Sequence, residues 1–225
     1  MDEPVAPPSP SSDPRAPRWR RRKEARPAEI LEAALELFVQ RGFAGARLED
    51  IAHRANCTKS TIFLYYAGKA ELFKATVRHA MVPMLEAAEH SIDDHQGSHR
   101  ELLVQLLRQR WSLMVETPLS GLTKLMYSEA AEFPDLARFY HDEVMIRSLG
   151  VIERVLAEGV VRGEFRPMDT RNVAPLALAP IMAAAMWRNS FGVTLPTPVD
   201  FKGLADTAIA HFLRGIDVHP ESANG

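Results

Sequence analysis

The segment LEDIAHRANCTKSTIFLYY at residues 48–66 decides the fold, because its residue order specifies both a geometry and a binding partner. Its first half carries one apolar stripe at helical spacing, formed by Leu48, Ile51, Ala52 and Ala55. Asn56 and Cys57 interrupt that pattern, and the hydroxyl of Thr58 is suited to cap a second short helix. The segment therefore predicts a helix-turn-helix.

The orientation of the second helix depends on Ile62, which we expect to point into the domain. At about 100° per residue, Ser60 and Leu64 then lie on the opposite side, with Thr61 and Phe63 on the flanks. Hydroxyl groups can bond to base edges, and Leu64 can touch a thymine methyl group. This face predicts a helix that enters the major groove of DNA. A helical hairpin with an ordinary solvated face fits the bare pattern equally well.

Side chains of phosphate-binding type surround this face, namely Lys59, Tyr65 and Lys69. Lys69 falls near the start of the next helix, whose free N–H groups also favour an anion. The net charge of the chain is only −2, but residues 15–26 are rich in arginine and contain one acid, Glu24. Their core, RWRRRKEAR, fits either a solubilising run or an arm that follows phosphates or enters the minor groove.

Composition indicates a globular protein of a reducing compartment. The chain has 225 residues, of which 46% are apolar, and this is enough for a substantial core. Cys57 is the only cysteine, which excludes an internal disulfide, and we expect it to pack inward as a small hydrophobic residue. The start MDEPVAPPSP lacks the features of a signal peptide, and the apolar run at 173–187 is too short to cross a bilayer. We expect a cytoplasmic protein with no membrane partner.

Helical periodicity runs through the whole chain, so the predicted fold class is all-α. Pro27 and Glu29 mark the expected start of the first helix, and Gly42 its end. A linking helix is expected at residues 70–90, with Pro83 as a kink. Further helices are predicted at residues 99–116, 119–131, 134–161, 170–191 and 199–215.

The runs ILEAALELFVQRGF and LEDIAHRANCTKSTIFLYYAGKAELF resemble the N-terminal domain of the TetR (tetracycline-repressor) family of bacterial transcriptional regulators. The resemblance implies an all-helical homodimer, joined through its last two helices, that binds an inverted-repeat operator in double-stranded DNA. It implies that a small-molecule effector in the C-terminal domain loosens this grip. It also implies that Lys59, Ser60, Thr61, Leu64 and Tyr65 occupy recognition-helix positions and that Lys69 contacts phosphate.

Three features depart from the family pattern. Ala46 and Arg47 stand where a threonine or serine usually caps the helix, although Arg47 can reach a phosphate instead. Phe63 replaces a common tyrosine, and Asn56 replaces a frequent glycine at a position where asparagine tolerates positive φ. The expected DNA-binding residues are Arg47, Thr58, Lys59, Ser60, Thr61, Phe63, Leu64, Tyr65 and Lys69.

The resemblance also divides the chain into functional parts. Residues 1–22 form a Pro- and Arg-rich tail that we expect to be flexible, and residues 23–72 form the three-helix DNA-binding domain. Residues 73–218, which begin in the linking helix, form the helical ligand-binding and dimerisation bundle, and residues 219–225 form a second flexible tail.

An aromatic and methionine-rich set in the C-terminal bundle suits an apolar or aromatic effector. The predicted ligand-binding residues are Trp111, Met114, Tyr127, Phe133, Tyr140, Met145, Trp187 and Phe191. At helical spacing the same side chains fit a plain core, and the sequence leaves both interpretations open.

Other chemistry is not indicated. The cluster EHSIDDHQGSH at residues 89–99 holds carboxylates and imidazoles, but His90 and His95 do not share a helical face, so we expect a solvated turn without metal. No catalytic or cofactor-binding motif occurs, and we expect neither an enzyme nor a cofactor. The predicted function is a DNA-binding repressor relieved by a small, largely apolar ligand. The alternatives are a protein-interaction adaptor and a small-molecule-binding enzyme that retain the fold.

Overall fold

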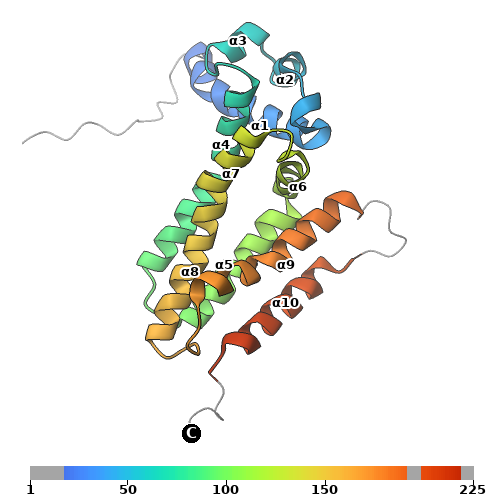
Figure 1. Cartoon of the computed structure of the whole chain (residues 1–225). Coiled ribbons are helices and arrows are strands. Elements are labelled where there is room, and N and C mark those ends of the chain that lie inside the picture. Colours follow the sequence, from blue (N-terminus) through green and yellow to red (C-terminus); the bar gives the residue numbers. More distant parts are fainter. Residues whose placement is uncertain (1–17, 192–198, 219–225) are drawn as a thin grey trace, which may run out of the picture.

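The computed structural model describes residues 18–191 and 199–218, with side chains described from residue 26 onward. Across these ranges the chain is helical apart from its turns and one isolated bridge between Phe165 and Asp217, and the predicted all-α class is confirmed. Figure 1 shows a small helical domain that carries α3, joined through α4 to a larger bundle. The elements are α1 (Arg18–Gly45), α2 (Leu48–Arg54), α3 (Lys59–Phe63), α4 (Lys69–Asp93), α5 (His99–Glu116), α6 (Leu119–Glu129), α7 (Pro134–Tyr140), the π-helical η1 (His141–Met145), α8 (Ile146–Val161), α9 (Thr170–Ser190) and α10 (Phe201–Ile216).

The first helix begins earlier than the sequence predicted. It starts at Arg18 rather than at Pro27, and Pro27 lies inside it. The preceding residues are mostly Arg, Lys, Glu and Ala, which are strong helix formers, and one proline removes only one donor from the ladder. The expected boundary between residues 22 and 23 therefore falls within a helix. Gly42 was predicted to end this helix; the backbone does leave the helical region there, with a φ of 75° and a ψ of 169°, but α1 continues to Gly45. Residues 1–17 of the predicted tail 1–22, and the predicted tail 219–225, lie outside the described residues.

The N-terminal domain packs α1, α2, α3 and the start of α4 around one apolar core. Its buried side chains are Ile30, Ala34, Phe38, Ile51, Ala52, Ile62, Leu72 and Phe73. The rings of Phe38 and Phe73 meet edge-on with centroids 5.0 Å apart. Phe43 meets Phe133, just before α7, in the same way at 4.8 Å. This aromatic contact ties the small domain to the larger bundle.

In the larger bundle, α5 lies at the centre and contacts α6, α8, α9 and α10. Its apolar face is buried at Leu102, Leu103, Leu106, Leu107, Trp111 and Met114. Residues 134–161 were predicted as one helix, but α7 and α8 are joined through η1, a π-helical turn that apolar periodicity does not reveal. In the described ranges, no helix has the length and apolar character needed to cross a membrane.

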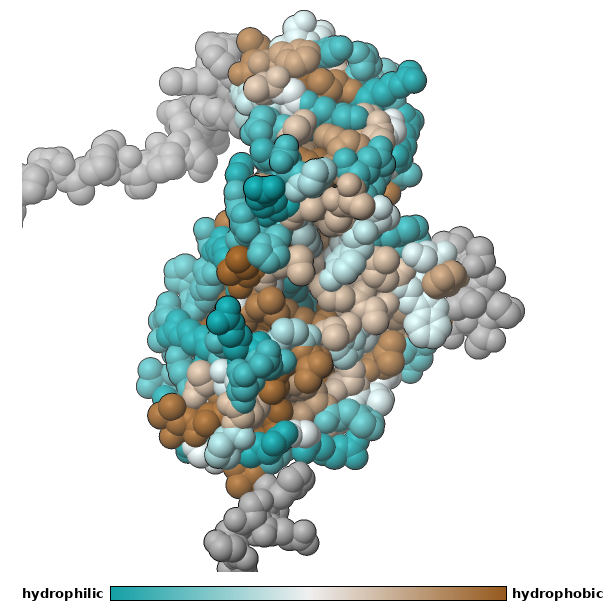
Figure 2. Space-filling view, in the orientation of Figure 1, coloured by the Kyte–Doolittle hydropathy of each residue, from teal (hydrophilic) through white to brown (hydrophobic). Residues whose placement is uncertain are grey.

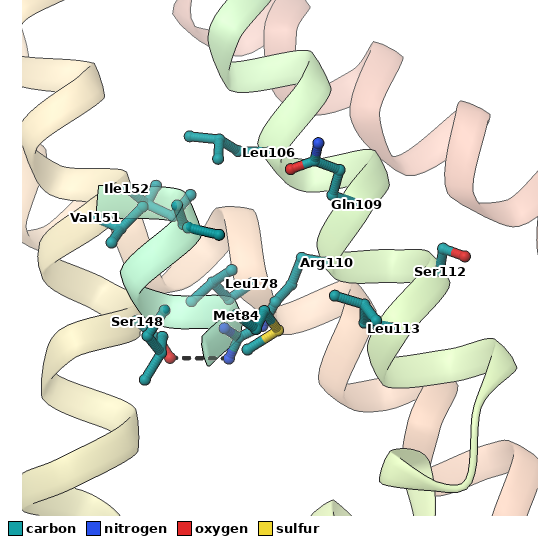
Figure 3. A pocket seen from close by; sticks show the side chains of 13 residues that line it. Met84, Leu106, Gln109, Arg110, Ser112, Leu113, Ser148, Val151, Ile152 and Leu178 are labelled. Atoms are coloured by element: carbon teal, nitrogen blue, oxygen red, sulfur yellow. Dashed lines mark hydrogen bonds between the residues drawn. The ribbon is translucent and has the colours of Figure 1, made fainter. Parts of the chain in front are cut away.

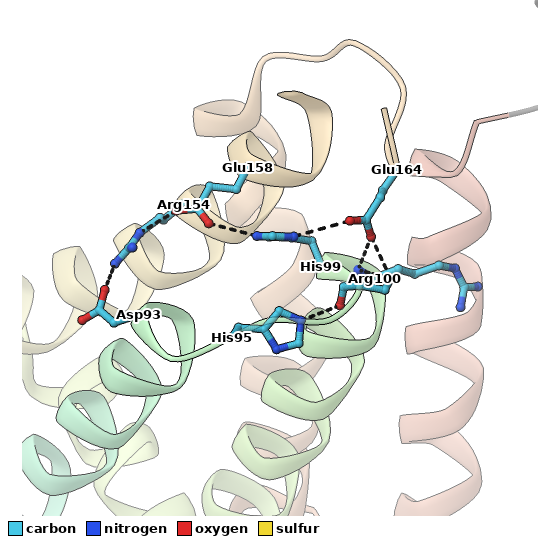
Figure 4. A network of polar contacts seen from close by, with 8 residues as sticks. Asp93, His95, His99, Arg100, Arg154, Glu158 and Glu164 are labelled. Atoms are coloured by element: carbon cyan, nitrogen blue, oxygen red, sulfur yellow. Dashed lines mark hydrogen bonds and ion pairs between the residues drawn. The ribbon is translucent and has the colours of Figure 1, made fainter. Parts of the chain in front are cut away.

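A polar network closes the end of the bundle away from the small domain (Figures 1 and 4). His99 at the start of α5 is 1% exposed, and its Nε2 lies 2.9 Å from a carboxylate oxygen of Glu158. Arg154 donates both to Glu158 at 2.8 Å and to Asp93 at 2.7 Å, which links α8 to α4. The expectation of a wholly solvated turn at residues 89–99 was wrong for His99, because carboxylates on distant segments provide partners for it. Among the described residues, no group of three potential metal ligands converges.

Candidate nucleic-acid interface and ligand cavity

The short helix α3 has the orientation that its sequence predicted. The Thr58 hydroxyl accepts a hydrogen bond from the backbone N–H of Thr61 at 3.2 Å, which confirms the predicted cap. Ile62 is fully buried, whereas Leu64, directly after α3, is 81% exposed. Ser60 is also exposed. The outer surface of α3 thus offers a hydroxyl and an apolar tip, at the end of the molecule remote from the bundle (Figure 1).

Other residues of the predicted DNA-binding surface differ in their solvent exposure and in their hydrogen bonds within the protein. Phe63 and Tyr65 are about half and one third exposed, at 48% and 37%. The Thr61 hydroxyl lies 2.9 Å from that of Thr58, so part of its hydrogen-bonding capacity is used within the protein. Arg47 is exposed at the start of α2 and provides no side-chain cap, which confirms the predicted loss of that cap.

Both predicted phosphate-binding lysines have partners within the protein. Lys59 donates to a carboxylate oxygen of Glu49 at 2.6 Å, and this hydrogen bond lowers the pKa of Glu49. Lys69 donates to the carbonyls of Ala44 and Ala46 at 3.0 and 3.1 Å. Its Nζ also lies 4.7 Å from the ring centroid of Phe43. An ammonium group has three donors, so Lys69 keeps one further donor while it links the end of α1 to the start of α4.

Arg26 has a structural role that the charge pattern did not reveal. Its guanidinium donates to the carbonyl of Ala55 at 3.0 Å and forms an ion pair with Glu29 at 2.8 Å. The bond to Ala55 holds the turn after α2 against α1, and the ion pair with Glu29 lies within α1. In that turn Asn56 has a φ of 49°, as its sequence context predicted. Cys57 is partly buried against the core, and burial raises the pKa of its thiol.

A cavity of about 400 Å³ lies in the larger bundle. Its walls come from α4, α5, α8 and α9, and Figure 3 shows α5 and α8 on opposite sides of it. Most of the lining is aliphatic, and the volume falls within the range of small-molecule sites. The lining residues are Met84, Leu85, Ala87, Ala88, Leu106, Gln109, Arg110, Ser112, Leu113, Ser148, Val151, Ile152 and Leu178.

Arg110 is the one ionisable side chain in this lining. It extends from α5 towards α8, where its Nη2 donates to the hydroxyl of Ser148 at 2.9 Å (Figure 3). Ser148 in turn donates to the carbonyl of Val144 in η1 at 2.6 Å. Burial lowers the pKa of the Arg110 guanidinium, while the nearby Tyr140 acts in the opposite direction. A guanidinium nevertheless remains protonated in proteins, so the cavity contains a fixed positive charge.

None of the predicted ligand-binding residues lines this cavity. Trp111, Met114 and Tyr140 are buried in the core, and Phe133 and Met145 pack partly buried against it. Tyr127, Trp187 and Phe191 are 51%, 44% and 61% exposed. The predicted set consists of aromatic and methionine side chains, whereas mostly small and aliphatic residues form the walls of this cavity. The available signal was Arg110 itself, which lies four and seven residues after Leu106 and Leu103 on the buried side of α5.

Family models match both domains of the chain. The model of bacterial regulatory proteins of the TetR family matches residues 30–76. The model of the C-terminal domain of AefR-like transcriptional repressors matches residues 101–215, about half of the chain.

The chain belongs to the TetR family. It is therefore a DNA-binding transcriptional regulator, and the enzyme alternative is discarded because its relatives are named as regulators.

Individual relatives of this TetR-family regulator agree with that assignment. A helix-turn-helix transcriptional repressor of Streptomyces coelicolor is 38% identical over 74 residues, which cover 33% of this chain and 38% of that protein. The fatty acid metabolism regulator protein of Bacillus subtilis is 25% identical over 153 residues, or 66% of this chain and 77% of that protein.

Solved structures share the fold. The regulator FadR of Bacillus subtilis, in complex with stearoyl-CoA, superposes with a TM-score of 0.72 at 20% identity, covering 85% of this chain and 99% of that one. A TetR-family regulator from Mesorhizobium loti superposes with a TM-score of 0.71 at 22% identity, covering 88% of this chain and 99% of that one.

Proposed function

We propose that this regulator is a homodimeric repressor that binds an inverted-repeat operator and releases it when a small, largely apolar effector enters the cavity. The main support for this proposal is that α4 contributes both to the core of the small domain and to the wall of the cavity. Leu72 and Phe73 at one end of α4 belong to the core that supports α3, and Met84 and Ala88 further along line the cavity. One helix thus connects a ligand site to a DNA-reading unit.

The DNA-binding role rests on the exposure and chemistry of the N-terminal surface. Ser60, Thr61 and Leu64 are the residues that we assign to base edges. Those assigned to phosphates or to positioning are Arg47, Thr58, Lys59, Phe63, Tyr65 and Lys69. Lys59 must exchange its bond with Glu49 for a phosphate, and this exchange is a cost of binding.

The homodimer is supported by an apolar face on α9. Leu176 and Trp187 are 61% and 44% exposed, and the exposed Ala179 and Ala183 lie between them at helical spacing. Leu204 on the neighbouring α10 is 36% exposed. Apolar residues gather over the bundle in the view of Figure 2, with hydrophilic residues along one margin. We assign α9 and α10 to the contact with a second copy, which brings two copies of α3 to one operator.

Release of DNA is explained by the required distance between the two recognition helices of the dimer. Two recognition helices must meet major-groove faces roughly 34 to 36 Å apart, so a shift of α4 weakens both contacts together. A second link joins the domains at the break in α1, where the backbone N–H of Phe43 donates to Glu129 of α6 at 2.9 Å. We infer that α4 and α6 have one arrangement that binds the operator and another that does not. An effector that binds the second arrangement more tightly lowers operator affinity, by at most the ratio of its affinities for the two arrangements.

The test uses the purified full-length protein and fluorescently labelled DNA from upstream of its own gene. Fluorescence anisotropy is expected to report binding that is stronger than to shuffled DNA and that falls steeply with salt. Apolar compounds that bind the cavity are expected to reverse it. Equal affinity for both DNAs at moderate salt would contradict the proposal and favour a protein-interaction adaptor.

A further inference from the structure

Among the residues that the structure describes, the charge of Arg110 has no carboxylate as its counter-charge. The cavity lining contains no acidic residue, and no carboxylate of the described residues forms an ion pair with this guanidinium. Its hydrogen bond to the neutral Ser148 is the only one that it donates within the same part of the chain. Charged groups in protein interiors are normally paired, because loss of hydration is costly.

Arginines at the neighbouring surface show the usual arrangement. Arg147 on α8 donates to both carboxylate oxygens of Glu89 on α4, at 3.0 and 2.8 Å. Arg154 is likewise paired with Asp93 and Glu158. Carboxylates therefore stand opposite the arginines where α4 meets α8 at the surface, whereas the half-buried arginine beside the cavity has none. The missing partner is what an effector can supply.

We propose that the effector is a carboxylate with an apolar body, and that its carboxylate pairs with Arg110. This inference rests on the proposed function, because it names the chemical class of the molecule that occupies the cavity. Ser148 and the carbonyl of Val144 position the guanidinium through two successive hydrogen bonds. The donors that remain can form the paired N–H···O bonds that a guanidinium makes with a carboxylate.

Size and polarity of the cavity agree with this class. A water molecule occupies about 30 Å³ in the liquid, so a cavity of about 400 Å³ holds an apolar body of roughly a dozen non-hydrogen atoms. Aliphatic side chains such as Leu106, Leu113 and Ile152 surround that space. A neutral ligand of the same shape would leave the guanidinium unpaired, and a cationic ligand would be repelled.

The test compares matched acids and alcohols by isothermal titration calorimetry on the full-length protein. The pairs are decanoate with decanol and 2-naphthoate with 2-naphthalenemethanol, so that the body is constant while the charge changes. At least one acid is expected to bind roughly ten- to a hundredfold more tightly than its alcohol at neutral pH. The proposal is overturned if neither acid binds, or if both alcohols bind as tightly as their acids.

Two variants test whether Arg110 causes the preference for acids over alcohols. In Arg110→Met the acid is expected to bind no better than its alcohol, whereas Arg108→Met is the matched control on α5. Arg108 is exposed and pairs with Asp206 at the surface, so its loss is expected to leave the preference unchanged. Circular dichroism checks that each variant folds. If Arg110→Met does not fold, Ser148→Ala replaces it and is expected to reduce the preference at least threefold, because it releases the guanidinium from its support. A preference that survives in the folded variant contradicts the proposal.

Two further arms separate possible failures. Methyl decanoate has a neutral ester where decanoate has its charge, so binding of methyl decanoate as tightly as decanoate would overturn the carboxylate assignment. Operator binding is measured on the same samples. Specific DNA binding without any preference for acids rejects only the ligand class, whereas loss of specific DNA binding rejects the proposed function.

Discussion

Truncation of Ile62 and of Leu64 is expected to have opposite consequences, although the two residues are only two positions apart. Ile62→Ala removes buried carbon atoms worth about 0.8 kcal/mol each and leaves a cavity in the core of the small domain, because Ile62 is fully buried. Together these terms are expected to lower the free energy of unfolding by about 2 to 5 kcal/mol. Leu64→Ala acts on a side chain that is 81% exposed, and its effect on stability is expected to stay within about 0.5 kcal/mol.

The same pair of variants separates stability from DNA recognition. Leu64→Ala is expected to cost about 1 kcal/mol of operator affinity, roughly a fivefold change, through loss of an apolar contact with a base. Urea unfolding followed by circular dichroism measures stability, and anisotropy with labelled operator measures affinity. The assigned orientation of α3 is wrong if Leu64→Ala destabilises the fold as much as Ile62→Ala, or if it leaves the preference for operator over shuffled DNA unchanged.

Three more outcomes follow from contacts between and within the domains. Lys69→Ala is expected to lower the free energy of unfolding by about 1 kcal/mol, because its bonds to two carbonyls are lost. It is also expected to lower the affinity for all DNA sequences equally. A change in affinity for one sequence alone, measured by anisotropy, would argue against a phosphate contact. Glu129→Ala is expected to lower Tm, because the backbone N–H of Phe43 loses its carboxylate acceptor. It is also expected to reduce the shift in operator affinity that a cavity ligand causes. An unchanged shift would show that the contact between Phe43 and Glu129 does not couple the two domains. The hydrogen bonds from His99 and then Arg154 lower the pKa of Glu158, so its stabilisation is present above its ordinary pKa near 4.5 and is lost as pH falls through the lower, folded value. Glu158→Gln is therefore expected to reduce the loss of stability between about pH 5 and pH 3 in urea titrations, and an identical loss in both proteins would contradict this sign.

The sequence predicted features that depend on nearby residues. The cap by Thr58, the burial of Ile62 and the exposure of Leu64 all follow from spacing within one short segment. The bounds of α5 and the start of α9 after Asp169 were predicted in the same way, since caps and apolar periodicity are local signals. Such local patterns predict which face of a helix is buried, but they do not predict which residues pack against that face.

Features that depend on distant residues were not predictable from these patterns. Lys69 was expected to be free for DNA, but the end of α1 provides two carbonyls for it. The cavity was missed because its walls combine single residues from α4, α5, α8 and α9, and no sequence spacing relates them. Arg110 could have been noticed as a charge on a buried helical face, although only the structure shows that none of the described carboxylates pairs with it.

Hydroxyl-radical footprinting tests whether α3 reads DNA as one of a symmetric pair. The full-length protein is first used to select its preferred duplex from a random pool, and the selected duplex is then footprinted. We expect an inverted repeat with two protected half-sites whose centres lie roughly 34 to 36 Å apart on one side of the DNA helix. Selection of no common sequence, or a single protected site without a symmetric partner, would contradict it.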